Sequence, residues 1–218
     1  MKAKRFFNGV LRVLFPPSCA ACRELGEEPL CETCRAALKK AYSPRKVLCK
    51  DGNGFADSVF ALFSYHDKTA RKLVLALKNE GHGFILDGMM PYFEKALPKM
   101  PSLADVDAIT FCPRSPRRAR FFGFDQARLL AERLSPLLNM PFRPLLSRSI
   151  FSVVQHHTGR TERRFRNVKG KFFAREKLNG ESILLIDDVV TSGATVSAAA
   201  QALKNAGAMH VYVLCFAH

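Results

Sequence analysis

Two hydrophobic patterns alternate along most of the chain. Runs of consecutive apolar residues, which are typical of strands inside a sheet, cover 58–65, 106–112, 181–186 and 210–216, and a further strand is expected within 142–148. Between them, apolar residues recur every three or four positions, as on the buried face of a helix. The helices that this spacing predicts cover 68–79, 84–97, 124–138 and 194–206. Alternating strands and helices predict an α/β fold, with a mostly parallel sheet flanked by helices.

The first 50 residues do not follow this alternation. Apolar residues at 4–15 have the spacing of a short amphipathic helix, and Asn8 and Arg12 interrupt the run too early for a signal peptide. No apolar run reaches the ~18 residues of a transmembrane helix, so we expect a cytoplasmic protein. Turn-forming residues at 43–54 mark a boundary. We therefore expect an N-terminal module of residues 1–50 and an α/β domain of residues 51–218.

Four of the seven cysteines lie in this N-terminal module as two closely spaced pairs. Cys19 and Cys22 form the first pair and Cys31 and Cys34 the second, which gives the pattern C-x₂-C-x₈-C-x₂-C. Two such pairs supply the four thiolates of a tetrahedral Zn²⁺ site, and the short spacer suits a ribbon-like hairpin. Four thiolates leave no open coordination position, so the expected zinc is structural. Reduced cysteines without a metal, or a redox-active pair, are the alternatives.

The segment 182–196 carries the strongest chemical signal. Four aliphatic residues lead directly into Asp187 and Asp188, and Thr191-Ser192-Gly193-Ala194-Thr195 follow at the start of the expected helix. Ligands of open α/β sheets bind beyond the carboxyl ends of the strands. Small residues and the free amides of a helix N-terminus bind phosphate, whereas carboxylates suit sugar hydroxyls or Mg²⁺. The segment therefore predicts a strand–loop–helix that holds a ribose 5-phosphate.

Two other interpretations of this segment are weaker. Asp, Thr and Gly also occur in loops that only cap a helix, but capping needs neither two adjacent acids nor a TxGxT-like run after four aliphatic residues. The stretch Leu184–Asp188 has the form of a Walker-B strand of an ATPase. The chain contains no GxxxxGK[ST] sequence to accompany it.

Positive charge is concentrated in one region of the chain. The formal net charge of the whole protein is +15. Between Cys112 and Lys177, sixteen Lys and Arg residues face four Asp and Glu residues, so this region alone contributes +12. Such a field attracts polyanions, either a small phosphorylated metabolite or a nucleic acid. Within the region, residues 150–172 form a long polar segment with little periodicity, which is typical of a functional loop.

Several segments together resemble a known protein family. Residues 183–196 resemble the phosphoribosyl pyrophosphate (PRPP) signature of type I phosphoribosyltransferases. The segments that resemble the ComF family more narrowly are the N-terminal cysteine pairs, Cys112–Ala127, Gln155 and Arg160–Phe172. Together they extend over nearly the whole chain. The resemblance implies a type I phosphoribosyltransferase-like fold with a small N-terminal zinc-ribbon module.

The resemblance also implies roles for individual residues. Asp187 and Asp188 would bind ribose hydroxyls at the catalytic centre, and residues 191–195 would enclose the 5-phosphate. The turn at 112–115 would bind pyrophosphate together with Mg²⁺, with Arg114 as the charged contact. The Arg-rich segment 155–171 would be a flap that excludes water. The basic residues that would contact the ligand or a nucleic acid are Arg117, Arg118, Arg120, Arg160, Arg163, Arg164, Arg166 and Lys169.

The chain departs from the common ComF pattern in two places. Where the family commonly has Arg-Gly-Phe-Asn-Gln, Phe122 removes a positive charge near the expected pyrophosphate turn and Asp125 adds a negative one. Arginines within 117–120 compensate for this change. Many ComF-like proteins also carry a second set of paired cysteines, whereas here only Cys49 follows the first set. We therefore expect a single zinc.

Three functions are compatible with these residues. The first is an enzyme that displaces pyrophosphate from PRPP with the help of Mg²⁺. The second, implied by the ComF resemblance, is a protein of DNA uptake that binds single-stranded DNA through its Arg-rich region, with Phe121, Phe122, Phe124 and Phe165 as stacking faces. The third is a sensor that binds PRPP without turning it over. The same arginines serve the first two functions, so the sequence leaves the choice open.

Overall fold

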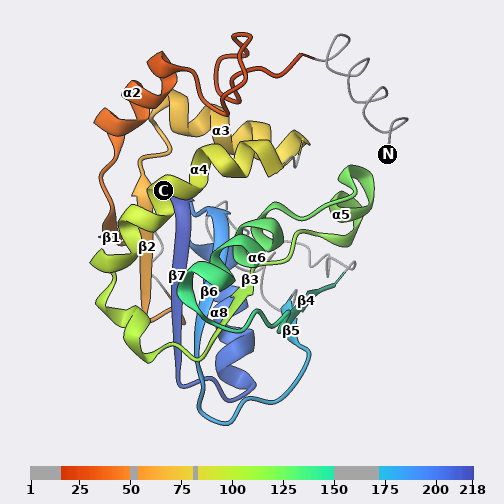
Figure 1. Ribbon diagram of the computed structural model, residues 1–218. Helices are drawn as coiled ribbons and strands as arrows, with labels where there is room; N and C mark the ends of the chain where they lie inside the picture. The colour runs from red at the N-terminus through yellow and green to blue at the C-terminus, as the bar shows by residue number, and fades with distance from the viewer. Residues whose placement is uncertain (1–15, 50–53, 81–82, 150–171) are drawn as a thin grey trace, which may run out of the picture.

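The computed structural model describes residues 16–49, 54–80, 83–149 and 172–218. Five strands form the main sheet in the order β1-β2-β7-β6-β3 (Figure 1). They are β1 Arg45–Val47, β2 Ser58–Phe63, β3 Ala108–Phe111, β6 Ser182–Val189 and β7 His210–Ala217. The edge strand β1 is antiparallel to β2, and the other neighbours are parallel. The mostly parallel sheet predicted from the hydrophobic pattern is confirmed.

The register of β6 determines where the loops of the sheet begin. Ile186 lies opposite Phe111 of β3 on one side and opposite Leu214 of β7 on the other. Asp187 follows opposite Cys215, at a level where β3 has already ended. The carboxyl ends of β3 and β6 therefore meet at one edge, as in other parallel sheets that bind ligands there.

Alternate residues of the strands contribute to two separate cores. In β6, Ile183 and Leu185 belong to one core and Leu184 and Ile186 to the other, because successive side chains of a strand point to opposite faces. The helices that pack on the side of Leu184 are α3 Lys68–Glu80, α4 Gly83–Ala96 and α6 Gln126–Leu138. The elements that pack on the side of Ile183 are α8 Ala194–Asn205, β4 Leu146–Arg148 and β5 Phe172–Ala174. The sheet is thus covered on both faces, which explains its continuous apolar strands.

The elements expected within the described residues are present with shifted ends, and several short elements are additional; the helix expected at 4–15 lies outside the described residues. The helix expected from residue 124 begins at Gln126, because Asp125 caps it. The additional elements are α2 Glu32–Ala41, α5 Pro116–Phe122, the strands β1 and β5, and the 3₁₀ turns Leu97–Lys99 and Pro101–Asp105. Helix α5 has the sequence Pro-Arg-Arg-Ala-Arg-Phe-Phe and no buried residue, so no apolar periodicity signals it. In the part of the chain described here, no helix is both long and apolar enough to cross a bilayer.

The cysteine segment differs from the expected ribbon. Its first pair lies in a tight turn closed by an antiparallel bridge between Ser18 and Leu25. The second pair does not form a hairpin, because helix α2 (Glu32–Ala41) begins directly after Cys31. The apolar side of α2 is buried through Leu38, in the same core as helices α3 and α4. The cysteine segment is therefore built from one turn and one helix, packed on the α3–α4 side of the sheet (Figure 1).

Replacing Gly207 with alanine is expected to lower the free energy of unfolding by about 2–4 kcal/mol. Gly207 has a φ of +109°, and an added Cβ would overlap the carbonyl oxygen of Leu178. Gly180 is the matched control, since its φ is +92° but a Cβ there meets nothing within 4 Å. Gly180→Ala should cost only the backbone strain, about 1 kcal/mol. Equal shifts of the two variants in urea unfolding would contradict the close packing of Gly207 on Leu178.

Candidate ligand and metal sites

A polar pocket of about 440 Å³ lies at the carboxyl edge of β3 and β6. Its lining comes from the end of α3, the loop after β3, the starts of α5 and α6, the end of β4, the end of β6 and the first turn of α8. The lining residues are Lys78, Cys112, Pro113, Arg114, Ser115, Arg118, Gln126, Arg148, Asp187, Asp188, Val189 and Thr195. Four of them are cationic and two are acidic. The structure therefore brings the predicted acidic pair together with Arg114, Arg118 and Thr195.

The two acids of β6 have different surroundings. Both are buried, and each accepts a hydrogen bond from the next backbone N–H at 2.9 Å. Burial, together with the neighbouring charge of Asp188, raises the pKa of Asp187 well above its ordinary value. Asp188 Oδ2 lies 3.4 Å from Nζ of Lys78 but accepts no hydrogen bond. Asp188 thus offers a buried carboxylate oxygen with an open hydrogen-bonding position, next to a lysine.

The loop after β6 ends at the N-terminus of α8. Gly193 precedes the helix with a φ of 85°, a left-handed conformation that glycine adopts without strain, and as the N-cap residue it has no side chain to accept from the helix amides. Ser192 Oγ is 3.4 Å from the N–H of Ala194, which is a long hydrogen bond. Thr195, in the first turn of α8, lines the pocket. Uncapped amides and nearby hydroxyls are the groups that bind phosphate at a helix N-terminus.

Asp125 holds the loop after β3 in place. Its Oδ2 accepts a hydrogen bond from the N–H of Arg114 at 2.7 Å, and its Oδ1 accepts from Ala127 and Arg128 at the start of α6. Burial raises the pKa of this carboxyl group, against the lowering effect of these hydrogen bonds. Both carboxylate oxygens are therefore occupied by backbone amides. The added acid is part of the scaffold, and it does not face the pocket as an unpaired charge.

Phe122, the other departure from the ComF pattern, supports Arg114. The guanidinium carbon of Arg114 lies 4.7 Å from the ring centroid of Phe122 and 5.4 Å from that of Phe124. The same guanidinium donates to the carbonyl of Phe124 at 3.4 Å and to that of Lys78 at 3.2 Å. Burial lowers the pKa of Arg114. Phe122 therefore replaces the arginine of the common ComF pattern with an aromatic ring, and this ring holds the guanidinium group of Arg114 in position.

The other predicted basic residues fall into two groups. Arg118 lines the pocket, whereas Arg117 and Arg120 are exposed on α5 and are not among the lining residues. The predicted residues that lie outside the described part of the chain are Arg160, Arg163, Arg164, Arg166 and Lys169. Among the residues of α5, Arg118 is therefore the one that lines the pocket.

Three pocket residues were not predicted from the sequence. Lys78 comes from the last turn of α3. Arg148, at the end of β4, donates to the carbonyl of Pro113 at 3.3 Å and lies 4.9 Å from the ring centroid of Phe172. Gln126 is the first residue of α6, and its buried Oε1 has no hydrogen-bond partner. Only Gln126 had a local signal, because it belongs to the Phe-Gly-Phe-Asp-Gln sequence. The other two reach the pocket through the fold.

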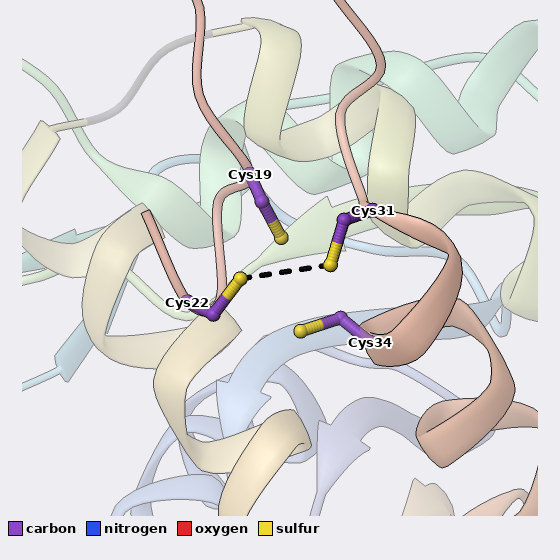
Figure 2. Close-up of side chains that lie close together, drawn as sticks. All are labelled: Cys19, Cys22, Cys31 and Cys34. Atoms are coloured by element: carbon purple, nitrogen blue, oxygen red, sulfur yellow. Dashed lines mark hydrogen bonds between the residues drawn. The ribbon is translucent and has the colours of Figure 1, made fainter. Parts of the chain in front are cut away.

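The four paired cysteines converge at the N-terminal end of α2. Their sulfur atoms all lie within 4.8 Å of one another, and Cys22 and Cys31 are 3.6 Å apart (Figure 2). Tetrahedral zinc with Zn–S bonds of ~2.3 Å separates its sulfurs by about 3.8 Å. The observed spacing fits such an ion and is far too long for the ~2.05 Å of a disulfide bond. The four residues could therefore hold a metal ion.

The thiols of this cluster are electrostatically unequal. Burial opposes ionisation of Cys19, but backbone N–H groups of Cys31, Cys22 and Ala21 lower its pKa to about 6. Burial and the neighbouring sulfurs raise the pKa of Cys34. Sulfurs packed this closely cannot all carry a negative charge without a cation between them, which is the condition that a metal ion satisfies.

The remaining cysteines lie elsewhere. Cys49, Cys112 and Cys215 are buried and belong to the core on the α8 side of the sheet. Burial raises the pKa of Cys112 and of Cys215 well above the ordinary value. Cys112 lines the pocket, but a thiol with a raised pKa is a poor nucleophile. Among the described residues, only the four paired cysteines form a group with metal-binding geometry.

Comparison with known proteins agrees with this architecture. Residues 126–218 match the phosphoribosyl transferase domain family. The chain is 36% identical over 110 residues to the DNA utilization protein YhgH of Escherichia coli O157:H7, and 34% identical over 110 residues to the proteins of the same name from Escherichia coli K12 and Salmonella typhi. Each match covers 50% of this chain and 48% of the relative. The chain thus spans about half the length of the curated relatives it matches.

The matched domain includes several of the residues that line the pocket. The domain match begins at Gln126, the first residue of α6, and includes the acidic pair, the phosphate-type loop and the strand β7. The paired cysteines, the strand order and the relatives all agree with the resemblance stated above. Residues 126–218 thus resemble a phosphoribosyl transferase domain, and the relatives agree with the resemblance to ComF proteins.

Proposed function

We propose that the pocket binds PRPP, or a closely related ribose 5-phosphate, together with Mg²⁺. The observation that carries this proposal is Asp188 Oδ2, a buried carboxylate oxygen without a hydrogen bond, in a pocket that also reaches the uncapped start of α8. A ribose hydroxyl would donate to this oxygen. The 5-phosphate would lie at residues 191–195, where the helix amides are available to an anion.

The cations of the pocket suit the pyrophosphate group. Lys78, Arg114, Arg118 and Arg148 all line it, on the side of the loop after β3. When Mg²⁺ is bound, it would neutralise pyrophosphate oxygens and make pyrophosphate a better leaving group, with the carboxylate of Asp188 available as an anionic oxygen ligand. The residues of the chain would orient C1 of the ribose for attack by an acceptor, while the basic side chains would stabilise the departing charge. The same pocket would also serve a PRPP sensor without transfer.

Titration with PRPP and Mg²⁺ is expected to release heat and to raise the melting temperature of the wild type. Asp188→Asn should weaken PRPP binding about tenfold or more, because it removes a charged hydrogen-bond acceptor. Asp57→Asn is the control: Asp57 pairs with Lys204 at 2.9 Å and with His210 at 3.2 Å, away from the pocket residues. It should lower stability and leave PRPP affinity unchanged. No heat and no thermal shift in the wild type would contradict the site.

Release of pyrophosphate distinguishes an enzyme from a sensor. An acceptor screen in a pyrophosphate-release assay would show turnover by the wild type and none by Asp188→Asn if transfer occurs. Binding without release for every acceptor class tested would favour the sensor.

We further propose that the four paired cysteines hold one structural Zn²⁺. The support is their sulfur geometry and the thiolate chemistry described above. The ion would tie the turn at Cys19–Cys22 to the N-terminus of α2.

Metal analysis of the purified protein is expected to give one zinc per chain. Cys34→Ala should lose the metal and lower the melting temperature, because the remaining three thiolates bind zinc more weakly. Cys49→Ala is the matched control, since Cys49 is also buried but lies outside the cluster. It should retain one zinc per chain. Full zinc content in Cys34→Ala would rule out the four-cysteine site.

A second candidate function is binding of single-stranded DNA. Two observations favour it: the matched relatives are named DNA utilization proteins, and α5 presents an exposed aromatic ring beside arginines. Phe121 is 82% exposed and packs edge-on against Phe122, with Arg117, Arg118 and Arg120 on the same short helix. Single strands are bound by this combination of stacking faces and backbone-tracking cations.

Binding of a single-stranded oligonucleotide is expected to weaken steeply with salt, with log K falling by about 0.7 per phosphate contact for each unit of log salt. Phe121→Ala should reduce affinity for an ordinary oligonucleotide about fivefold or more, by loss of base stacking. It should leave an abasic oligonucleotide of the same length unaffected. Met209→Ala, at an exposed apolar residue far along the chain, is the control. Absence of any binding at low salt would exclude this function.

A further inference from the structure

The last turn of α3 is shared by the pocket and the cysteine segment. Lys78 points to the pocket, where its Nζ lies 3.4 Å from Asp188 Oδ2. Two residues later, Glu80 pairs with Arg23 of the cysteine segment. Residues two apart on a helix face different directions, so one turn of α3 contacts both sites with separate side chains.

The pair between Arg23 and Glu80 has a forked geometry. Nη1 of Arg23 donates to Oε2 of Glu80 at 3.0 Å, and Nη2 donates to Oε1. Two parallel hydrogen bonds fix direction as well as distance, which a single contact does not. This ion pair joins the cysteine segment to α3, whereas Arg35 of the same segment pairs with Glu28 within it.

The backbone at Arg23 depends on the closed cysteine turn. Arg23 follows Cys22 and has a φ of 69°, a left-handed conformation that costs a non-glycine residue roughly 1 kcal/mol or more. Its N–H donates to the carbonyl of Cys19 at 2.9 Å, which closes the turn. A metal ion held by Cys19 and Cys22 would favour this conformation. Without the ion, relaxation of the turn would move the Arg23 side chain away from Glu80.

On the pocket side, the end of α3 holds two cations. The side chain of Lys78 faces Asp188, and the carbonyl of Lys78 accepts a hydrogen bond from Arg114 at 3.2 Å. A shift of this turn would therefore displace Lys78 directly and remove one of the contacts that hold Arg114. Both residues line the pocket on the side proposed for pyrophosphate.

We propose that Arg23 is a positioning residue for the pocket: through Glu80 it holds Lys78 in place for the pyrophosphate group, so that metal binding at the cysteines and ligand binding in the pocket strengthen each other. The inference rests on the proposed function, because it takes PRPP as the ligand. The coupling is reciprocal, as any equilibrium linkage between two sites must be. Its size is set by a half-exposed ion pair and corresponds to a change of about two- to fivefold in affinity.

The test compares charge reversals measured by calorimetric titration with PRPP and Mg²⁺. Arg23→Glu and Glu80→Arg are each expected to raise the Kd about fivefold, and the double reversal R23E/E80R should restore it. Arg35→Glu is the matched control, because Arg35 is in the same segment and similarly exposed but pairs with Glu28. It should leave the Kd unchanged. Lys78→Met should weaken PRPP more than ribose 5-phosphate, which lacks the pyrophosphate.

A second readout measures the metal. Transfer of zinc to a competing chelator is expected to require more chelator when PRPP is present, and this effect should be smaller in Arg23→Glu than in the wild type or in Arg35→Glu. Single reversals that leave the Kd within twofold of the wild type, or a double reversal without recovery, would overturn the inference while leaving the proposed function intact. A wild type that binds no PRPP would overturn both.

Discussion

Two consecutive carboxyl groups are buried at the end of strand β6, and much of the surrounding structure compensates for them. Burial of a charge is costly unless a partner is supplied. Asp187 meets this condition by a raised pKa, and Asp188 by the ammonium group of Lys78. The register of β6 fixes the position of Asp187 and Asp188. Shifting the strand by one residue would turn each of its buried side chains to the opposite face of the sheet. The ends of α3, β4 and α6 are arranged around this edge.

A second network holds the loop opposite the acids. Asp125 uses both carboxylate oxygens on backbone amides, and the rings of Phe122 and Phe124 hold Arg114 from the side. From the sequence alone, Asp125 and Phe122 count only as reductions of the positive charge near the pocket. In the structure, both hold Arg114 in position. Counting charges along a sequence misjudges such positions, because the count does not include the amide groups that a carboxylate binds.

The fold and the centre of the candidate site could be predicted because their signals are local. Aliphatic runs identify buried strands, and the acids, the small-residue loop and the cysteine pairs are each contiguous in the sequence. Lys78 and Arg148 could not be predicted, since each lies about 40 or more residues from the acids and reaches them only through the packing of α3 and β4. The same limit applies to α5, which buries nothing and so leaves no periodic pattern. Helix α2, which begins inside the second cysteine pair, could not be predicted because Cys31 takes the N-cap position in place of a usual capping residue.

The contact between Lys78 and Asp188 has a consequence for the order in which molecules enter the pocket. The ammonium group of Lys78, beside the open Oδ2 of Asp188, already occupies the place that a free divalent cation would take. Bare Mg²⁺ would have to displace this ammonium group and would gain only one strong anionic ligand in exchange. A magnesium ion that arrives already chelated by a polyphosphate brings its own ligands and gives the lysine a new partner. Under the proposed function, the pocket therefore selects the magnesium complex of its ligand over the free ion.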